Sequence, residues 1–508
     1  MRLFLSVLLC SISLFTTAQK KEKIQILNAE EFRYSEKSKK DAQRLIGNVQ
    51  LKHQDVLMFC DSAYIYKSSS YVEAFGNVRI KQGDSLTLYG DYLQYVSDKK
   101  KADIQRNVRL VRPDLVLSTD RMIMDRNTNM AYYENGGTIK STTDNNTLVS
   151  KKGYFHMKSN VMYFKEEVIL TSPEYTISSD TMRYNTNNSE ISFFGPTEIV
   201  SKENYIYCEN GYYNTITERS IFYKNAYLLS ENKELRGDTI AYDREKGYGE
   251  ARSNVSIIDT VENIIVKGNL AKFFEQQDSI EVSKKALLVQ PFEEDTLFMH
   301  AKLFRVFPNK EGKRILQAFY QVNIYKKDLQ GSCDSVAYAF TDSSLKMFYS
   351  PILWSDQNQI TGSIININTS NGKIDQLFIP ENAFITSEVD SNKSRYNQIK
   401  GKQLTGTFIQ NELRKVFIEG NGQTIYYGQD ENQKFIGVNR AESSDLLIGI
   451  KSNDIETITF MNDPDATLYP LNELDVEELK LGGFKWQGAF RPESNAELFT
   501  WRRGNLRK

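Results

Sequence analysis

The sequence is poor in the residue types that most catalytic and metal sites use. Its 508 residues include 3 histidines, 4 cysteines and 10 prolines. His53, His156 and His300 lie roughly a hundred residues or more apart, which is not a metal-ligand spacing. The chain has no Gly-x-Ser-x-Gly nucleophile motif and no phosphate-binding loop motif. We therefore expect no enzymatic activity, no cofactor and no metal site.

The sequence also lacks an excess of charge of either sign. It has 64 Lys and Arg residues against 65 Asp and Glu residues, which gives a formal net charge of −1. Proteins that bind nucleic acid carry a basic excess on the binding domain. The balance excludes a nucleic-acid partner. After the first eighteen residues, no run reaches the roughly 18 apolar residues that a membrane helix needs.

The longest apolar segment lies at the N-terminus. Arg2 precedes an apolar stretch from Leu3 to Phe15, and small residues follow up to Ala18. This order is typical of a secretory signal peptide, which we assign to residues 1–18. Cys10 does not fit a lipidation site, because two leucines precede it where small residues are expected. The exported chain keeps three cysteines, and this odd number implies no disulfide framework.

Aromatic residues are abundant, with 29 Tyr and 28 Phe, and they favour pleated strands. A short Asn-Val motif recurs along the chain. Its first three valines, Val49, Val78 and Val108, lie 29 and 30 residues apart. The motif predicts a repeat of about 30 residues, present in about fourteen copies. Its copies are Gly47–Leu51, Gly76–Ile80, Asn107–Leu110 and Asn254–Ile257.

A second motif lies between these segments. An acidic residue follows an apolar residue by three positions and precedes an aromatic residue by four. Before the acidic residue the apolar side chains occupy odd positions, and after it they occupy even positions, so the inward face changes parity. A straight strand cannot do this, so we predict a bend or bulge with the acidic side chain outside the core or capping the turn. These structural acidic corners are Asp61, Asp91, Asp120, Asp180, Glu209, Asp238 and Asp334.

Calcium binding is the alternative for the acidic residues. Neighbouring copies would stand about 9 to 10 Å apart, which is too far for one ion to be shared. We favour turn capping.

Turn-forming residues recur on both sides of each bend, so one repeat is two arms joined by hairpins. The predicted fold is all-β, an elongated bent β-jellyroll of stacked antiparallel hairpin repeats. Its inward residues form an apolar trough, which is either a self-filled core or a groove for acyl chains. An acyl chain would gain about 0.8 kcal/mol of binding free energy for each methylene group buried in such a groove. The candidate groove residues are Met58, Ala63, Leu88, Leu93, Leu117, Met122, Ile177, Met182, Ile206, Leu235 and Ile240.

The Gly-Asn-Val-x-Leu segments and the Leu-x-x-Asp-x-x-x-Tyr units resemble the OstA/LptA-type family of Gram-negative bacteria, most of all its long OstA-like members. The resemblance extends over about Ile24 to Ile258. It implies a periplasmic, outer-membrane-associated bridge protein that shields lipopolysaccharide acyl chains during outer-membrane biogenesis. It also implies partners, namely other jellyroll proteins of the lipopolysaccharide-transport bridge and the outer-membrane translocon. Edge strands expected at Ile24–Leu27 and near Leu446–Ile450 would stack against them.

A structural or adhesive cell-envelope repeat protein with a self-filled core remains the alternative function. The domain plan places OstA-like repeats in 19–258 and more diverged repeats in 259–465. If the diverged part has a break, the polar run at 387–402 is the expected place. Residues 466–508 are interpreted as a C-terminal cap or a docking segment, with a cap favoured because an open sheet edge needs covering.

Overall fold

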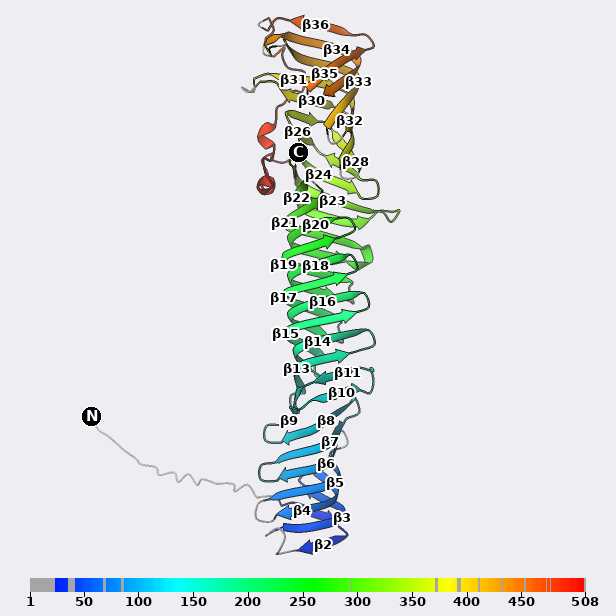
Figure 1. The fold of residues 1–508 in the computed structure, drawn as a ribbon, viewed down its shortest axis with the longest axis vertical. Helices are drawn as coiled ribbons and strands as arrows, with labels where there is room; N and C mark the ends of the chain where they lie inside the picture. Colours follow the sequence, from blue (N-terminus) through cyan, green and yellow to red (C-terminus); the bar gives the residue numbers. More distant parts are fainter. Residues whose placement is uncertain are drawn as a thin grey trace, which may run out of the picture. The chain divides into compact units, whose positions relative to one another are not determined.

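The chain folds into antiparallel β-strands (Figure 1). This computed structural model describes residues 23–506, with gaps at 35–41, 67–69, 84–85, 294, 371–372, 391–393, 410–411, 431, 433, 452–453, 472 and 476. The expected signal peptide and Cys10 lie outside the described residues. Helical structure in the described part is limited to three short 3-10 turns, at Glu275–Gln277, Gly488–Phe490 and Asn495–Phe499. The predicted all-β class is confirmed.

Contacts divide the chain into two compact units, residues 1–194 and 195–508. The boundary falls within one strand, β15 (Glu190–Ser201). The other strands of the first unit are β1 (Gln25–Asn28), β2 (Glu31–Tyr34), β3 (Ala42–His53), β4 (Val56–Tyr66), β5 (Tyr71–Gln82), β6 (Leu86–Val96), β7 (Lys101–Val111), β8 (Leu115–Asp125), β9 (Met130–Tyr133), β10 (Gly137–Ser141), β11 (Thr147–Ser150), β12 (Lys152–His156), β13 (Val161–Thr171) and β14 (Tyr175–Asn185).

The second unit repeats the hairpin pattern and then changes to shorter strands. Its regular strands are β16 (Asn204–Asn214), β17 (Arg219–Ser230), β18 (Lys233–Asp243), β19 (Tyr248–Asp259), β20 (Ile264–Phe274), β21 (Ser279–Pro291), β22 (Thr296–Pro308), β23 (Arg314–Lys326) and β24 (Leu329–Ala339). The later strands are β25 (Ser344–Phe348), β26 (Ile352–Ser355), β27 (Asn358–Thr361), β28 (Ile364–Ser370), β29 (Lys373–Ile379), β30 (Ala383–Glu388), β31 (Tyr396–Gly401), β32 (Gln403–Ile409), β33 (Glu412–Gln429), β34 (Phe435–Lys451), β35 (Asp454–Met461) and β36 (Asp465–Tyr469).

Each long strand bends near its middle, where its pairing register shifts. In the β3–β4 pair the shift lies between Ile46 and Val49, and the same irregularity recurs in β4–β5, β5–β6, β6–β7 and β7–β8. The bend divides every hairpin into two arms. We call the halves equivalent to residues 42–46 and 62–66 arm A, and those equivalent to 49–53 and 56–60 arm B. The predicted bent hairpin repeat is confirmed.

Left-handed backbone at two successive residues produces the bend. Gly47 and Asn48 have φ values of 77° and 44°, and Gly76 and Asn77 have φ values of 73° and 44°. Glycine has no Cβ to clash in this region, and asparagine tolerates it better than most residues. Some later copies keep the asparagine and replace the glycine, as in the pair Ser253 and Asn254, and others have neither residue, as in the pair Lys284 and Lys285. The recurring Gly-Asn motif of the sequence therefore encodes the bend itself.

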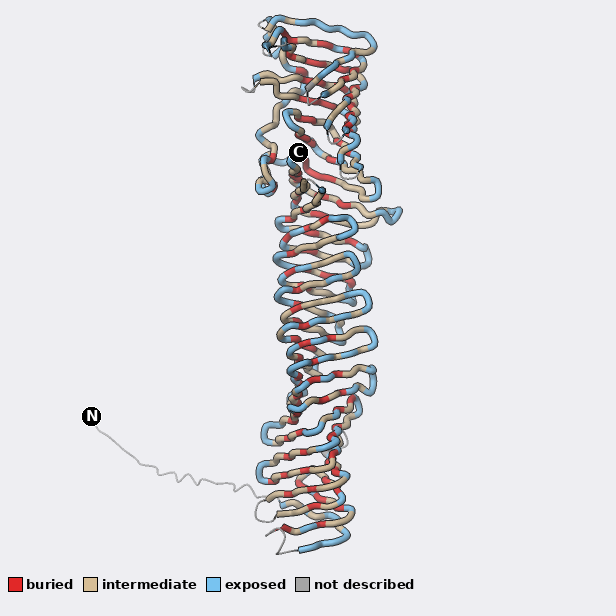
Figure 2. The backbone as a smooth tube through the Cα atoms, viewed as in Figure 1, coloured by how far each residue is buried: buried red, intermediate tan, exposed pale blue. Residues whose placement is uncertain are grey.

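The core lies between the two arms. In β4, Met58, Cys60 and Ala63 are buried, and Asp61 between them is exposed, so the inward face changes parity across the bend. Figure 2 shows buried and exposed residues alternating along the strands of both units. The three cysteines Cys60, Cys208 and Cys333 are all buried small fillers in this position.

The second unit departs from the expected register in its later repeats. The polar run 387–402 is not a break in pairing, because β30 and β31 form a hairpin from Ala383–Gly401 to Glu388–Tyr396. The next bend lies at Lys402, whose N–H donates to the Gly420 carbonyl at 2.8 Å. Longer turns move this bend away from the position that a constant repeat length predicts.

The strand segment Leu446–Ile450 is not an edge. It lies in β34, which pairs with β33 on one side and with β35 on the other. Its backbone N–H and C=O groups are hydrogen-bonded to these two strands, so none is left to pair with a strand of another protein.

The C-terminal segment runs back over the second unit and does not close its end. After β36, residues 478–503, which we call the strap, pass along the outer face of arm B from β34 toward β22 (Figure 1). Gln398 donates its amide to the Leu479 carbonyl at 2.8 Å and accepts from the Leu481 N–H at 2.9 Å. The strap therefore docks within its own chain and forms a third layer on this face.

A second clamp of the same kind holds the strap two strands further on. Gln359 donates to the Lys485 carbonyl at 2.8 Å and accepts from the Gln487 N–H at 2.7 Å. Both glutamines are almost fully buried, at 1% and 2% exposure. Because each amide satisfies two main-chain groups, these clamps recognise the backbone of the strap and not its side chains.

Candidate ligand groove

The eleven candidate groove residues lie on the inward faces of the two arms, close to the bends. Nine are buried at 5% exposure or less, and Ile206 and Leu235 are partly buried. They pack against one another across the narrow part of each hairpin. None of them lines the three cavities described below. Their role in ligand binding stays a prediction.

The acidic residues lie at the bends and hold the left-handed asparagines of the next strand. Asn77 Nδ2 donates to Asp61 Oδ2 at 2.9 Å, and Asn254 Nδ2 donates to Asp238 Oδ2 at 2.9 Å. The same bond joins Asn107 to Asp91 at 2.6 Å and Asn225 to Glu209 at 2.8 Å. A carboxylate one strand away thus fixes the side chain of the residue that makes the bend.

The remaining three predicted corners differ in their surroundings. Asp120 is exposed at its bend, and Asp180 accepts a hydrogen bond from the Thr181 hydroxyl at 3.2 Å. Asp334 is buried and accepts from the Ser335 hydroxyl at 2.8 Å. In one repeat the position of the acidic corner is occupied by Lys151, and the carboxylate lies on the next strand instead. This lysine forms an ion pair with Glu167. The ion pair replaces the carboxylate–amide bond of the other repeats.

The first unit has a cavity of about 890 Å³ at the open side of the hairpins, between the tips of arm A and arm B. We call this opening the mouth of the first unit. Its apolar walls come from both arms, with Leu110 and Leu115 from arm B and Ala131, Phe155 and Met162 from arm A. Each is buried. The arms diverge here, so apolar side chains face a space that they do not fill.

The rim of this mouth carries mostly positive charge. Lys100, Arg112, Arg126 and Lys158 line it, together with one carboxylate, Asp114. Arg112 Nε lies 3.1 Å from Asp114 Oδ1, and Arg126 pairs with Asp55 at 2.7 Å, so Lys100 and Lys158 are the two cations in excess at this rim. An apolar cavity with a cationic rim favours a ligand with an apolar body and an anionic group at its surface.

One side of the mouth is closed by contacts between the two arms. His53 at the tip of arm B and Tyr95 on arm A are both buried, and His53 Nδ1 lies 2.5 Å from the Tyr95 hydroxyl. Above them, Arg126 from an arm A turn donates to Asp55 Oδ1 at 2.7 Å and to Gln54 Oε1 at 3.3 Å. Burial raises the pKa of Tyr95, so its hydroxyl stays protonated.

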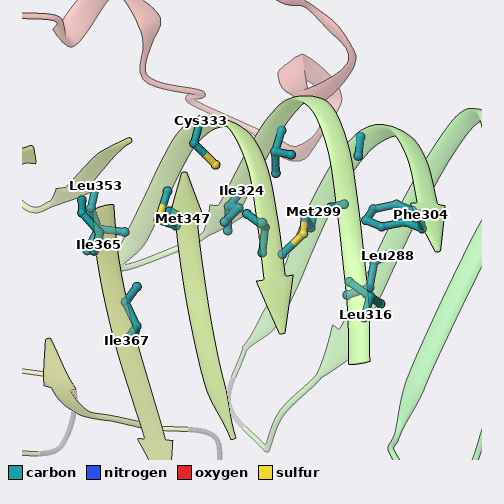
Figure 3. Packing of buried hydrophobic residues seen from close by; sticks show 14 of the residues in the cluster. Leu288, Met299, Phe304, Leu316, Ile324, Cys333, Met347, Leu353, Ile365 and Ile367 are labelled. Atoms are coloured by element: carbon teal, nitrogen blue, oxygen red, sulfur yellow. The ribbon is translucent and has the colours of Figure 1, made fainter. Parts of the chain in front are cut away.

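The second unit holds two smaller cavities between its arms, of about 380 Å³ and about 370 Å³. Ile264 and Leu316 line both of them, so the two lie next to each other. Figure 3 shows Met299 of β22, Leu316 and Ile324 of β23 and Met347 of β25 in this interior. The interior of the second unit is therefore apolar but not completely filled.

The rim of the first of these two cavities has the opposite charge from the mouth of the first unit. It carries three carboxylates, Glu231, Asp259 and Glu262, against the two cations Lys233 and Arg314. Burial, and then the neighbouring Asp259, raise the pKa of Glu262. This rim is less suited to an anionic group than the mouth of the first unit.

The residues that line the mouth of the first unit were not singled out from the sequence. A usable signal was present, because Leu86 and Leu115 lie five positions before an acidic corner and Phe155 lies four positions after the corner residue Lys151. Residues at these repeat positions point inward and lie far from the bend. The two arms are widest apart at that distance from the bend. Arg126 had no such signal, because its role depends on the opposite arm.

The histidines and cysteines are used in structural contacts. His156 Nδ1 lies 2.8 Å from the Ser159 hydroxyl, and His300 Nδ1 lies 2.7 Å from the Ala286 carbonyl. Burial raises the pKa of the Cys60 and Cys333 thiols to about 12. Within the described residues, no group of three or more His, Cys, Asp or Glu side chains is placed to hold a metal ion. No helix in that part of the chain is long and apolar enough to cross a membrane.

Comparison with known protein families finds a match in the N-terminal part of the chain. Residues 21–180 match the OstA-like protein family, so the resemblance seen in the sequence motifs is confirmed for that segment. No curated protein matches the chain. Among solved structures, a similar one is LptH of Pseudomonas aeruginosa, described as the LptA homologous periplasmic component of the conserved lipopolysaccharide transport device. It is 14% identical, the match covers 22% of this chain and 93% of that chain, and the TM-score is 0.21.

Proposed function

We propose that this chain is a periplasmic groove protein that binds lipopolysaccharide by its acyl chains and shields them on the way to the outer membrane. The observation that carries the proposal is the mouth of the first unit, an unfilled cavity of about 890 Å³ with apolar walls from both arms and a polar rim whose charged residues are mostly cationic. In a purely structural repeat protein such an unfilled space would lower the stability and bring no benefit, because apolar side chains around it lose packing contacts.

The chemistry of the mouth matches an amphiphile with anionic groups. Each methylene that moves from water into the cavity contributes about 0.8 kcal/mol. Arg126 and Lys158 stand at the rim, where the phosphates of a lipid headgroup would lie while its chains enter the cavity. Hydrogen bonds between guanidinium groups and phosphates are charge-assisted and stronger than neutral ones.

The identity of the cargo rests on the OstA-like family and not on the cavity alone. The cavity supports an acyl amphiphile with an anionic headgroup, and the family resemblance narrows this to lipopolysaccharide. The expected signal peptide supports export to the periplasm.

The first strands support a partner at the N-terminal end of the first unit. Strands β1 and β2 pair with β3, and they expose Leu27, Phe32 and Tyr34 by 52%, 56% and 64%. Exposed apolar side chains on such strands are typical of a surface that another protein covers. We propose that a jellyroll protein of the transport bridge or the translocon stacks there. Ile26→Pro should weaken that assembly and leave β4 to β14 folded, and normal assembly of this variant would place the interface elsewhere.

Site-specific photocrosslinking in cells tests the groove. A photoreactive amino acid at Leu110 or Phe155 would point into the cavity, whereas the matched positions Arg109 and Tyr154 are the neighbouring, outward-facing residues on the same strands. We expect lipopolysaccharide to be captured from Leu110 and Phe155 and not from Arg109 or Tyr154. Met122, Met182 and Ile240, which are buried at the bends, should capture less.

The outcome also separates the two functions considered. Absence of lipid from both inward positions, with each variant folded and exported, would contradict the groove and favour the structural or adhesive repeat protein. Equal capture from inward and outward positions would indicate non-specific contact with the membrane and would contradict it as well.

A further inference from the structure

The contacts that close one side of the mouth form two layers. The lower layer is the buried pair His53 and Tyr95, at 3% and 5% exposure, with His53 Nδ1 2.5 Å from the Tyr95 hydroxyl. The upper layer is the ion pair between Arg126 and Asp55, at 2.7 Å. In both layers one residue comes from arm A and the other from arm B. The cluster therefore ties the two arms together at the one place where they would otherwise separate.

The ion pair of the upper layer can be replaced by a contact between Arg126 and an anionic ligand. The Asp55 side chain is 56% exposed and that of Arg126 is 22% exposed, and ion pairs with one partner this exposed are weak. Arg126 also lines the cavity, so the residue that pairs with Asp55 borders the ligand space. A phosphate in the mouth can offer two oxygens to the guanidinium in the same way as a carboxylate does, with a larger charge.

The lower layer has a different character. Both His53 and Tyr95 are buried, so a ligand in the mouth does not reach them directly. Their contact joins the tip of β3 to β6. Once the upper layer opens, this buried contact is what still holds the two arm tips together at this point.

We propose that His53, Tyr95, Arg126 and Asp55 form a latch across the mouth of the first unit, which an anionic lipid headgroup opens by taking Arg126 away from Asp55. This inference rests on the proposed function, since it concerns the same groove. Arg126 is then a specificity-determining residue: it binds the anionic group of the ligand, and the loss of its bond to Asp55 lets the arm tips move apart. An amphiphile without an anionic group binds to the cavity and leaves the latch closed.

The experiment measures binding of three probes to the full chain. Dodecyl phosphate carries the anionic group and the acyl body, dodecyl maltoside carries the body alone, and inorganic phosphate carries the anion alone. Asp55→Asn frees Arg126, and we expect dodecyl phosphate to bind about three to ten times more tightly to this variant. Arg126→Gln should weaken dodecyl phosphate binding about tenfold and leave dodecyl maltoside binding unchanged.

A matched control is available on β8, the strand that ends directly before Arg126. Arg121 pairs with Asp103 at 2.6 Å, is as close to its partner as Arg126 is to Asp55, and lies outside the mouth. Arg121→Gln and Asp103→Asn should change the binding of none of the probes. Hydrogen exchange of the backbone at 53–57 and 95–100 reports the latch directly. It should become faster when dodecyl phosphate binds and stay unchanged with dodecyl maltoside.

Three results would overturn the latch. These are equal effects of Arg126→Gln on the phosphate and the maltoside probes, no effect of Asp55→Asn, or faster exchange with inorganic phosphate as strong as with dodecyl phosphate, which would indicate a free-anion site. If dodecyl maltoside and dodecyl phosphate both fail to bind the unmodified chain, the proposed groove itself is wrong. The two failures are thereby distinguished.

Discussion

Asn107 Nδ2 lies 2.6 Å from Asp91 Oδ2, and this bond joins two successive strands at their shared bend. The same partners, sixteen positions apart, recur in three further hairpins. Asn107 has a left-handed φ of 51°, which asparagine tolerates and most residues do not. In these four hairpins one acidic residue and one asparagine thus fix the bend that separates the two arms.

Removing this bond should destabilise the first unit by a modest amount. Asp91→Ala deletes the acceptor, and we expect the free energy of unfolding to fall by about 1 kcal/mol, the usual net value of such a hydrogen bond. Urea denaturation measures the change. Asn107→Gly is the matched variant, because it also loses the bond but keeps the left-handed conformation. Asn107→Ala should cost about 1 kcal/mol more than Asn107→Gly, and equal costs would show that the backbone is not strained.

A larger effect is expected at Gly76, which precedes the asparagine of an earlier bend. Its φ is 73°, and a Cβ at this position would overlap the Asp61 carboxylate. Gly76→Ala should destabilise the first unit by about 2 to 4 kcal/mol, because strain and a steric clash add. Gly83→Ala is the control, since Gly83 has a φ of 61° with open space around it and should show the strain alone, at about 1 kcal/mol. Similar losses in urea denaturation for both variants would exclude the clash.

The strap should detach when its glutamine clamps are removed. Gln398→Ala leaves the Leu479 carbonyl and the Leu481 N–H without their partner, at a cost of about 1 to 3 kcal/mol for each buried group. We expect faster proteolytic cleavage within residues 478–491. Gln423→Ala is the control, because the amide of Gln423 donates to Glu442 and not to the strap. Cleavage of both variants at the same rate would show that the clamp does not hold the strap.

The strap should also loosen in acid, through His300. Burial lowers the pKa of this histidine below its ordinary value, and its ring lies 4.6 Å from the ring of Phe499 in the strap. A histidine whose pKa is lowered by folding binds a proton more readily in the unfolded chain than in the folded one. Its contribution to stability is therefore fully present above the unfolded pKa of about 6.5. The contribution is lost as the pH falls below that value.

The measurement is the free energy of unfolding at pH 7.5 and at pH 5.5. The loss between them should be larger for the unmodified chain than for His300→Phe, by up to about 1.4 kcal/mol per pH unit below the unfolded pKa. The phenylalanine variant keeps a ring against Phe499 but has no proton to gain. Carboxylates titrate in both proteins, so only the difference between them reports on His300. An identical pH dependence would contradict this role.

The repeat, the bend and the inward face could be predicted from the amino-acid sequence. These are local properties: left-handed backbone at Gly76 and Asn77 follows from the sterics of two residues, and the alternation of Met58, Cys60 and Ala63 follows from the pleat of one strand. The acidic corners follow in the same way, because Asp61 and Asn77 meet across neighbouring strands of one hairpin. Where the turns lengthened, as in the hairpin of β30 and β31, a constant repeat length was a poor guide to the later register.

The position of the open part of the groove, and the contacts that close one side of it, depend on long-range packing. Arg126 and Asp55 are 71 residues apart and His53 and Tyr95 are 42 apart, and they meet because the twist of the stacked strands brings an arm A turn over an arm B turn of an earlier hairpin. The strap is a similar case, because its path depends on amides spaced along the outer face of arm B. Such contacts join residues that share no strand and no turn, so no local pattern in the sequence predicts them.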